Sequence, residues 1–408
     1  MNITINPKPL KGVVDIPASK SVAHRMIICA ALAQGKSVIK NVYPSKDIIA
    51  TIEAMKALGA HIELKEDTAT IRGIDVSSEN AVIDCCESGS TLRFLIPVVC
   101  ALGTNATFIG QGKLPQRPIT PYLEEFPKHN VVFDYNNTMP FSVSGKLSAG
   151  KFYISGSISS QFITGLLLAL PLLDGDSEII LTSHLESKPY VDITIGTIKD
   201  FGCEITETEN GYYIKGNQHY KPFNGNVEGD YSQAAFFEVA NLLGSHIEIN
   251  GLNKNSFQGD KKIVEICREI VYNNNDVLKP FDLDCSDIPD LVPILTVLAC
   301  FCNGISHITN VARLRIKECD RLEAISTCLN KIGANVKAYE DSLEITGVKE
   351  LCGGVVDGYN DHRIPMSMAV AATRCTKPLT ILGAQCVSKS YPDFFEVYKK
   401  IGGDISAD

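Results

Sequence analysis

The sequence lacks an excess of positive charge. It contains 47 Asp and Glu residues against 38 Lys and Arg residues, which gives a formal net charge of −9 at pH 7. General binders of nucleic acid or of acidic membrane surfaces need a basic face, so this balance argues against both classes. A dense group of cations in this chain must therefore be a local feature.

Membrane-spanning segments and a secretory leader are also missing. The longest apolar runs, residues 162–173 and 291–302, fall short of the roughly 20 residues that a membrane span needs. The first residues, Met1 to Ile5, do not have the pattern of a secretory leader. We therefore expect a cytoplasmic protein without a membrane partner.

Metal-binding motifs are absent from the sequence. The chain has 14 cysteines but no CxxC pair, and its eight histidines form no HExxH group. Most cysteines, such as Cys29, Cys100, Cys300 and Cys328, lie in apolar runs. This pattern predicts reduced, buried thiols and no metal site.

A complete ATP-binding P-loop is missing as well. Gly35-Lys36-Ser37 imitates the end of this loop, but position 30, where the loop needs another glycine, is Ala30. A P-loop also leads into a helix, whereas these residues lead into a β-rich segment, residues 38–42.

The sequence does contain a repeated unit in which an apolar helix is followed by a short β-rich strand. Six such strands align on one apolar residue each, at spacings of 69, 72, 69, 59 and 73 residues. The aligned residues are Ile39, Phe108, Ile180, Ile249, Ile308 and Ile381. Alternating helices and strands predict an α/β or α+β fold.

Several predicted helices are apolar on all sides, which is typical of helices buried on every side. They cover residues 92–102, 162–173, 234–243, 291–302 and 364–372. We expect these helices to lie inside a shell of strands, as in an inverted αβ barrel. The turn-rich segment 224–230 divides the six units into three and three.

Basic residues recur near the expected starts of helices. A cation there opposes the helix dipole, at a cost of up to about 1 kcal/mol, unless an anion compensates it. The stretch 17–25 is the first example, with Lys20, Ser21 and Arg25 at the start of an apolar helix. The full set is Lys20, Arg93, Arg117, Lys317, Arg321 and Arg363. The pattern favours a binding site for phosphate or carboxylate groups.

Two carboxylates are candidate acid–base groups. Asp290 precedes a buried helix, and Glu318 follows Lys317 directly. A carboxylate near several cations normally has a lowered pKa and serves as a base. From spacing alone, a helix cap at Asp290 and an ion pair at Glu318 explain these residues equally well.

Ten stretches, in this order along nearly the whole chain, resemble the EPSP synthase (3-phosphoshikimate 1-carboxyvinyltransferase) family. The runs 314–321 and 359–363 are the most specific. The ten stretches are 17–25 (PASKSVAHR), 88–93 (SGSTLR), 116–118 (QRP), 157–161 (SISSQ), 187–192 (SKPYVD), 228–230 (EGD), 288–290 (IPD), 314–321 (LRIKECDR), 359–363 (YNDHR) and 389–393 (KSYPD).

The resemblance implies two similar domains, each made of three βαβαββ units with their helices inside. The first domain would comprise residues 1–18 and 229–408, and the second residues 19–228. In the family, the active site lies in the cleft between the domains and closes on substrate.

The resemblance also implies a reaction. Members of the family transfer the enolpyruvyl group of phosphoenolpyruvate to the 5-hydroxyl of shikimate 3-phosphate by addition and elimination. They need no metal or organic cofactor. We expect these two small molecules as the partners of this chain, and a monomer as its state.

Site residues carry over position by position. The expected shikimate 3-phosphate contacts are Lys20, Ser21, Arg25, Ser159, Ser160, Gln161, Ser187, Tyr190, Asp290 and Lys317. The expected phosphoenolpyruvate contacts are Lys20, Gly89, Arg117, Gln161, Arg321, Arg363 and Lys389. Asp290 is the expected base and Glu318 the expected acid, with Lys20 and His362 close to the proton transfers.

Two positions depart from the family pattern, because Glu87 and Arg313 stand where asparagine is common. The sister family, the UDP-N-acetylglucosamine enolpyruvyl transferases, usually carries a reactive cysteine in the loop that corresponds to residues 110–118, and this chain has none there. That sister activity and a non-catalytic anion-binding scaffold are the alternatives.

Overall fold

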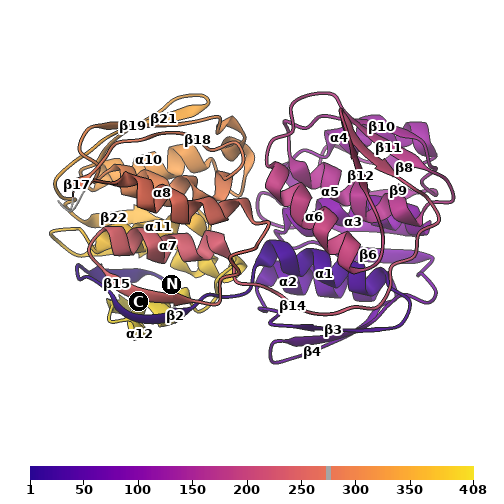
Figure 1. Cartoon of the computed structure of the whole chain (residues 1–408), viewed down its shortest axis with the longest axis horizontal. Helices are drawn as coiled ribbons and strands as arrows, with labels where there is room; N and C mark the ends of the chain where they lie inside the picture. Colours follow the sequence, from indigo (N-terminus) through magenta and orange to yellow (C-terminus); the bar gives the residue numbers. More distant parts are fainter. Residues whose placement is uncertain (273–276) are drawn as a thin grey trace. The chain divides into compact units, whose positions relative to one another are not determined.

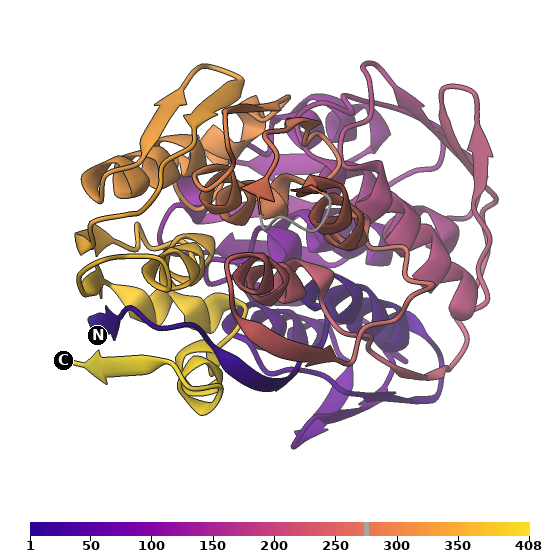
Figure 2. The same cartoon turned by 60° about the vertical axis from the view of Figure 1, so that its left-hand side comes forward.

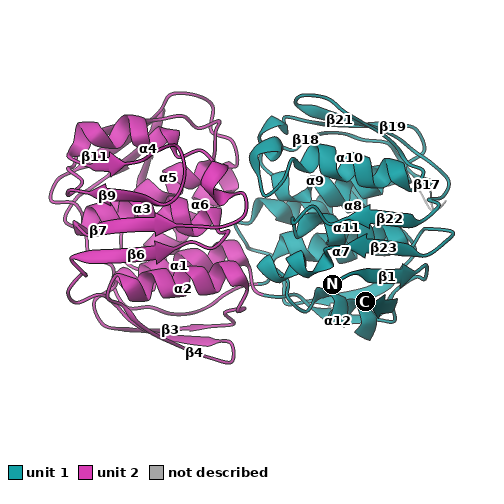
Figure 3. Cartoon of the chain, turned by 180° about the vertical axis from the view of Figure 1, so that it is seen from behind, with its two compact units in different colours: residues 1–17, 229–408 teal, residues 18–228 magenta. Residues whose placement is uncertain are grey.

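The computed structural model describes residues 1–272 and 277–408, and its elements are shown in Figure 1. The chain forms two compact units, coloured separately in Figure 3: unit 1 contains residues 1–17 and 229–408, and unit 2 contains residues 18–228. Ala18 belongs to unit 2, one residue before the expected boundary, because its side chain packs in the core of that unit.

Unit 2 contains three four-stranded sheets with one topology. In each sheet the first two strands are parallel and the remaining neighbours are antiparallel. The sheets are β14-β3-β5-β4 (Asn224–Asn226, Lys36–Lys40, Thr68–Arg72, His61–Lys65), β6-β7-β9-β8 (Asn80–Asp84, Asn105–Ile109, Phe141–Ser144, Val132–Asp134) and β10-β11-β13-β12 (Lys151–Ile154, Ser177–Leu181, Gly211–Ile214, Thr206–Thr208).

Unit 1 repeats this topology in two sheets and adds two strand pairs. The two ends of the chain complete one sheet, because β1 pairs with both β23 and β24, so both termini lie side by side (Figure 2). The elements are β18-β19-β21-β20 (Asp282–Asp284, Ile305–Thr309, Ser342–Thr346, Asn335–Ala338), β22-β23-β1-β24 (Gly354–Asp357, Leu379–Leu382, Ile3–Asn6, Asp404–Ala407), β2-β15 (Lys11–Asp15, His246–Asn250) and β16-β17 (Val271–Tyr272, Val277–Leu278).

All six strands of the predicted repeat are present, as β3, β7, β11, β15, β19 and β23. The aligned apolar residue is buried in four of these strands. Ile180 and Ile249 are only half-buried, whereas Ile179 of β11 and Ile247 of β15 are buried. Side chains alternate between the two faces of a strand, so Ile180 lies on the outer face of β11.

The predicted buried helices lie inside the sheets. Figures 1 and 3 show helices in the middle of each unit and strands around them. The inner helices are α1 (Lys20–Leu32), α3 (Gly89–Leu102), α5 (Ser160–Ala169), α7 (Tyr231–Leu242), α9 (Val292–Ala299) and α11 (Arg363–Ala372). In α3, every residue except Ser90 and Leu102 is buried. The fold class predicted from the sequence is therefore confirmed.

The remaining helices are more amphipathic or short. They are α2 (Lys46–Ala57), α4 (Thr120–Glu125), α6 (Lys188–Asp200), α8 (Lys262–Ile270), α10 (Arg321–Lys331) and α12 (Phe394–Lys400). Short 3-10 turns include η1 (Leu114–Gln116), η5 (Pro289–Leu291) and η6 (Ala312–Ile316). No helix within residues 1–272 and 277–408 is both long and apolar enough to cross a bilayer.

The cysteines behave as predicted. All 14 are free thiols, and all but Cys86 and Cys352 are buried. Burial raises the pKa of Cys100 and of the other inner thiols, because a thiolate is costly in an apolar core.

Candidate active site

The start of α1 forms the first part of the candidate site in unit 2. Ser19 caps the helix by accepting a hydrogen bond from the Val22 backbone N–H. Lys20, the first helical residue, places its Nζ 2.8 Å from Oδ2 of Asp47, in the first turn of α2. Asp47 therefore offsets part of the unfavourable position of Lys20 on the helix dipole. No local sequence pattern predicts Asp47 as the partner of Lys20.

Arg25 lies one turn further into α1 and is buried. Its Nε donates to Thr194 Oγ1 at 2.7 Å, and its Nη atoms donate to the carbonyl oxygens of Ser21 and Tyr190. A fourth bond reaches Thr164 Oγ1. Burial lowers the pKa of Arg25 to about 10, so it remains charged at neutral pH. Arg25 thus binds α1 to α5 and α6, and most of its donors are used within the protein.

The start of α5 supplies hydroxyl and amide groups. Ser159 caps the helix by accepting from the Gln161 backbone N–H, and Ser160 is buried. The Gln161 side chain accepts from Arg93 Nη1 at 2.7 Å and donates to Ser90 Oγ at 3.0 Å. Arg93 is the fifth residue of α3, and its Nη2 also donates to the Pro118 carbonyl. Arg93 therefore fixes the orientation of the Gln161 amide.

Gly89 and Arg117 are in direct contact. A methyl group on Gly89 would lie 2.5 Å from Nη1 of Arg117. Arg117 follows η1 and precedes α4, in extended conformation. The prediction that residues 116–118 open a helix is wrong, because α4 begins only at Thr120.

The last predicted residues of unit 2 lie at the start of α6. Ser187 is the N-cap residue of this helix, is buried and has a left-handed backbone with φ of 57°. Such a conformation is uncommon for serine and is found at functional sites more often than elsewhere. Tyr190 is half-buried, and its carbonyl oxygen accepts from Arg25.

In unit 1 the predicted residues form a network of carboxylates and arginines around Arg321. This arginine, the first residue of α10, is 2% exposed. Its three nitrogens donate to Asp361 Oδ2 at 2.6 Å, Asp290 Oδ1 at 2.9 Å and Glu318 Oε2 at 2.9 Å. Asp361 is fully buried and was not predicted as a site residue.

Asp290 bridges two arginines, because its second oxygen accepts from Arg363 Nη2 at 2.9 Å. Arg363, the first residue of α11, also donates to the side chain and carbonyl of Ser232. The alternative of a helix cap at Asp290 is wrong, since its carboxylate binds side chains and makes no cap bond. At Glu318 the ion pair is present, and its partner is Arg321.

Electrostatics hold the Asp290 carboxylate in its charged form. Burial by itself would raise the pKa of Asp290, but Arg363 and Arg321, followed by Lys317 and His362, hold this pKa well below its ordinary value. Carboxylates raise the pKa of both arginines against the effect of their burial: Asp361 first, then Glu318 and Asp290, at Arg321, and Asp290 first at Arg363. Asp290, Arg321 and Arg363 are therefore charged at neutral pH.

The remaining predicted residues of unit 1 lie around this network. Lys389 is buried, and its Nζ donates to the Asn360 carbonyl at 2.6 Å; Tyr359 and Asn360 form a turn with left-handed backbones. His362 is buried next to Asp361. Lys317 ends η6 four residues before α10, so its predicted place at a helix start is wrong.

The two departures from the family pattern have defined contacts. Arg313 donates to the Ser286 carbonyl oxygen, so part of its guanidinium is bound within unit 1. Glu87 lies against the loop 110–118, since a methyl group on Gly112 would come within 2.3 Å of Glu87 Oε2.

These features define a class of protein. It has an inverted α/β architecture in two units, and hydroxyl groups, amides and strong cations gather at the starts of its helices. Such groups suit small substrates that carry phosphate and carboxylate groups.

Comparisons identify the family. The EPSP synthase (3-phosphoshikimate 1-carboxyvinyltransferase) family model matches residues 5–398. A 3-phosphoshikimate 1-carboxyvinyltransferase of Clostridium perfringens is 48% identical over 421 residues, covering 100% of this chain and 99% of that protein. The corresponding protein of Clostridioides difficile is 47% identical over 428 residues, covering 99% and 98%. The chain belongs to the EPSP synthase family.

A solved structure supports the fold independently. EPSP synthase from Acinetobacter baumannii matches with a TM-score of 0.83 and 24% identity, over 100% of both chains.

Proposed function

We propose that this chain transfers the enolpyruvyl group of phosphoenolpyruvate to the 5-hydroxyl of shikimate 3-phosphate, as a 3-phosphoshikimate 1-carboxyvinyltransferase of the shikimate pathway. The observation that carries the proposal is family membership over residues 5–398. The products are 5-enolpyruvylshikimate 3-phosphate and phosphate. Both substrates are anionic, so cations must hold them together against their mutual repulsion.

The proposal assigns the acceptor mainly to helix starts in unit 2. Shikimate 3-phosphate would be bound by Lys20, Ser21, Arg25, Ser159, Ser160, Gln161, Ser187 and Tyr190, together with Asp290 and Lys317 of unit 1. Serine hydroxyls and a fixed amide suit the ring hydroxyls and the phosphate. Arg25 would contribute chiefly by holding α1 in place, because four of its hydrogen bonds lie within unit 2.

Phosphoenolpyruvate would be bound by residues from both units: Lys20, Gly89, Arg117, Gln161, Arg321, Arg363 and Lys389. Substrate anions would then compete with Asp290 and Glu318 for the guanidinium groups of Arg321 and Arg363.

This competition gives Asp290 a mechanism as the general base. Bound to two arginines, its carboxylate has a low pKa and is a weak base. When the arginines turn toward the substrate anions, the lost attraction raises the pKa of Asp290. Proton acceptance from the 5-hydroxyl then becomes favourable as substrate binds.

Proton transfers complete the sequence of steps. The hydroxyl oxygen bonds to C2 of phosphoenolpyruvate while Glu318 protonates C3, which gives a tetrahedral intermediate. In the elimination, Glu318 takes a proton back from C3 while phosphate leaves C2 and carries away the proton held by Asp290, which restores the double bond. Lys20 would stabilise negative charge near these atoms. The steps form one C–O bond, break another and move protons without a net change of oxidation state, so the proposal needs no redox cofactor; that it needs no metal is what the family resemblance implies.

A phosphate-release assay tests this function. Purified chain with phosphoenolpyruvate and shikimate 3-phosphate should release phosphate and form the enolpyruvyl product. UDP-N-acetylglucosamine in place of shikimate 3-phosphate should give none. Phosphate release with UDP-N-acetylglucosamine but not with shikimate 3-phosphate would show that the chain has the activity of the sister family. No release with either acceptor would favour a non-catalytic anion-binding scaffold.

The proposal includes the expected state and location of the enzyme. We expect a cytoplasmic monomer, and light scattering at catalytic concentrations checks the monomer.

A further inference from the structure

The outer face of the sheet β14-β3-β5-β4 carries a row of cationic side chains. Ser37 and Ile39 of β3 are buried, so Lys36 and Lys40 project from the opposite face. In the strand register Lys36 lies opposite Arg72, and Arg72 lies opposite His61. The side chains of Lys36, Arg72 and His61 thus lie side by side on three neighbouring strands, with about 5 Å between neighbouring Cβ atoms.

This arrangement is unfavourable for the sheet by itself, since like charges directly opposite one another are destabilising. Within the described part of the chain, no ion pair involves Lys36, Lys40 or Arg72. The basic residues at the margin of the row are different: Lys56 pairs with Glu53, and Lys65 pairs with Glu63.

The internal repeat provides controls for this observation. The described part of the chain contains four other four-stranded sheets of the same topology. Two of them, β6-β7-β9-β8 and β22-β23-β1-β24, contain no Lys or Arg in their strands. Each of the other two has one lysine, Lys151 or Lys337, and each lysine pairs with a glutamate. Topology therefore does not require the row of cations.

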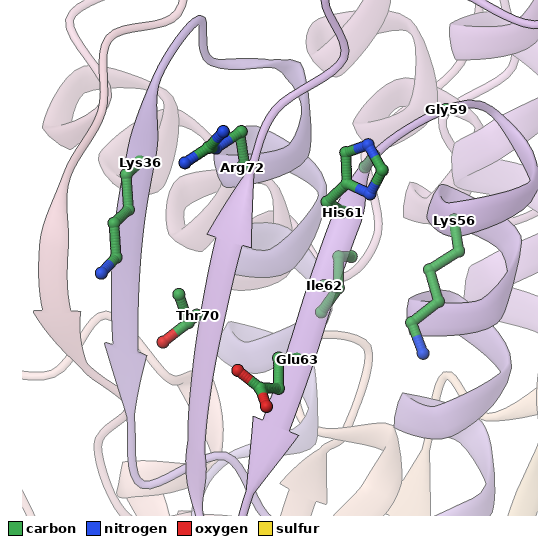
Figure 4. A pocket seen from close by; sticks show the side chains of 9 residues that line it. Lys36, Lys56, Gly59, His61, Ile62, Glu63, Thr70 and Arg72 are labelled. Carbon is green, nitrogen blue, oxygen red and sulfur yellow. The ribbon is translucent and has the colours of Figure 1, made fainter.

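The row borders a hollow of about 730 Å³, which is within the range of ligand pockets. Figure 4 shows Arg72 and His61 at one end of the hollow, and Thr70 and Glu63, which lie opposite each other on β5 and β4, at the other end. Lys36 and Lys56 border it from β3 and α2. The end of the hollow near Arg72 is thus cationic, and the only carboxylate among its lining residues is paired with Lys65.

We propose that this hollow binds a small molecule that carries a diphosphate or two neighbouring phosphate groups. The Arg72 guanidinium offers a planar fork for one phosphate, and Lys36 and His61 on either side suit a second. A nucleic acid or long acidic peptide fits less well, because the turn that joins β4 to β5 carries Glu66 and Asp67, Glu53 already pairs with Lys56, and the whole chain has a net charge of −9. None of these residues belongs to the proposed active site.

Proton NMR of the His61 ring provides a local test. The C2 proton resonance is assigned by its loss in His61→Gln, and inorganic pyrophosphate is titrated to about 10 mM, tenfold above a dissociation constant of 1 mM. We expect a saturable shift of this resonance. In the double variant Lys36→Gln/Arg72→Gln the apparent affinity should fall at least tenfold.

Matched controls separate this site from the active site. Lys151→Gln/Lys337→Gln removes two exposed lysines from other sheets and should leave the His61 titration unchanged. The variant Lys36→Gln/Arg72→Gln should retain the wild-type kcat and KM for both substrates in the phosphate-release assay, and the His61 titration tests the hollow independently of that assay. A His61 resonance that does not respond to pyrophosphate, or that responds equally in the Lys36→Gln/Arg72→Gln variant, would overturn the proposal.

Discussion

At the scale of single residues, Gly89 is the position where one added methyl group has the clearest consequence. In Gly89→Ala this group would lie 2.5 Å from Arg117 Nη1, so the guanidinium must move. We expect the KM for phosphoenolpyruvate to rise by about tenfold, the effect of 1.4 kcal/mol, with a smaller change for shikimate 3-phosphate. Glyphosate, an expected inhibitor competitive with phosphoenolpyruvate, should lose potency in parallel.

Gly175→Ala is a matched control, because its methyl group would meet only Ala149 Cβ, at 3.2 Å. Steady-state kinetics and inhibition curves of both variants make the comparison. Unchanged values in Gly89→Ala would show that Arg117 does not bind phosphoenolpyruvate.

Asp290 combines a catalytic and an electrostatic prediction. Asp290→Asn should lower kcat by at least about a hundredfold, the usual scale for a lost general base. It should also lower stability at neutral pH, because Arg321 and Arg363 lose the charge that pairs them. The folded-state pKa of Asp290 lies below its unfolded value near 3.9, so its carboxylate stabilises the fold above that pH.

The pH dependence of the unfolding free energy follows from the lowered pKa of Asp290 in the folded state. The stability difference between wild type and Asp290→Asn should be full near pH 7 and shrink as the pH falls through the lowered pKa of Asp290. Urea unfolding at several pH values measures it, with the exposed Asp404→Asn as control. A difference that grows toward acid pH would contradict the assignment.

Residue types were easier to predict than their partners. The serine caps Ser19, Ser88 and Ser159 follow from local sequence, because a cap bonds to a backbone N–H two or three residues away. The contacts Lys20–Asp47 and Arg93–Gln161 join residues 27 and 68 positions apart. Only tertiary packing brings these side chains together, so no local pattern contains them.

At the scale of elements, a chain of buried hydroxyl groups joins α1, α2 and α3. His24 Nδ1 lies 2.7 Å from Thr51 Oγ1, which lies 2.7 Å from Thr91 Oγ1. Thr91 in turn donates to Ser88, the N-cap of α3. Burial, with Lys20 and Arg25 nearby, lowers the pKa of His24 well below its ordinary value, so the imidazole is neutral.

Thr51→Val keeps the volume of the side chain but breaks this chain at its middle. It leaves polar groups of His24 and Thr91 buried without their partner, which should cost about 1–3 kcal/mol of unfolding free energy. Urea unfolding measures the loss. Thr104→Val is the control, because Thr104 Oγ1 is buried and has no hydrogen-bond partner among the described residues. This variant should be at least as stable as wild type.

The positions of the long helices follow from the sequence, whereas the exact residues at which helices begin do not. The long apolar helices were predicted well because their buried faces repeat over several turns. Arg117 and Lys317 were misplaced because each follows a 3-10 turn and precedes the next α-helix by several residues. Both residues have an extended backbone, so their side chains are positioned by the segment between the 3-10 turn and the next helix and not by the first turn of a helix.

At the scale of the whole molecule, the chain leaves unit 1 after Pro17 and returns to it at Gly229. Two local bonds mark these crossings. Ser19 N–H donates to the Glu228 carbonyl at 2.7 Å, and Asp230 N–H donates to the Pro17 carbonyl at 2.9 Å. The sixfold period in the sequence revealed the repeat, whereas pairing of the two chain ends in one sheet depends on contacts across nearly the full length.

This connectivity predicts that residues 18–228 fold alone. The two ends of this segment are hydrogen-bonded to each other through Ser19 and Glu228, and its apolar core contains only its own residues. The expressed fragment should show native-like circular dichroism and cooperative urea unfolding, but no turnover, because Asp290 and Glu318 lie in unit 1. The complementary fragment 229–408 should not fold stably, because it lacks β1, which lies between β23 and β24, and β2, the partner of β15. An unfolded 18–228 fragment would show instead that its core requires unit 1.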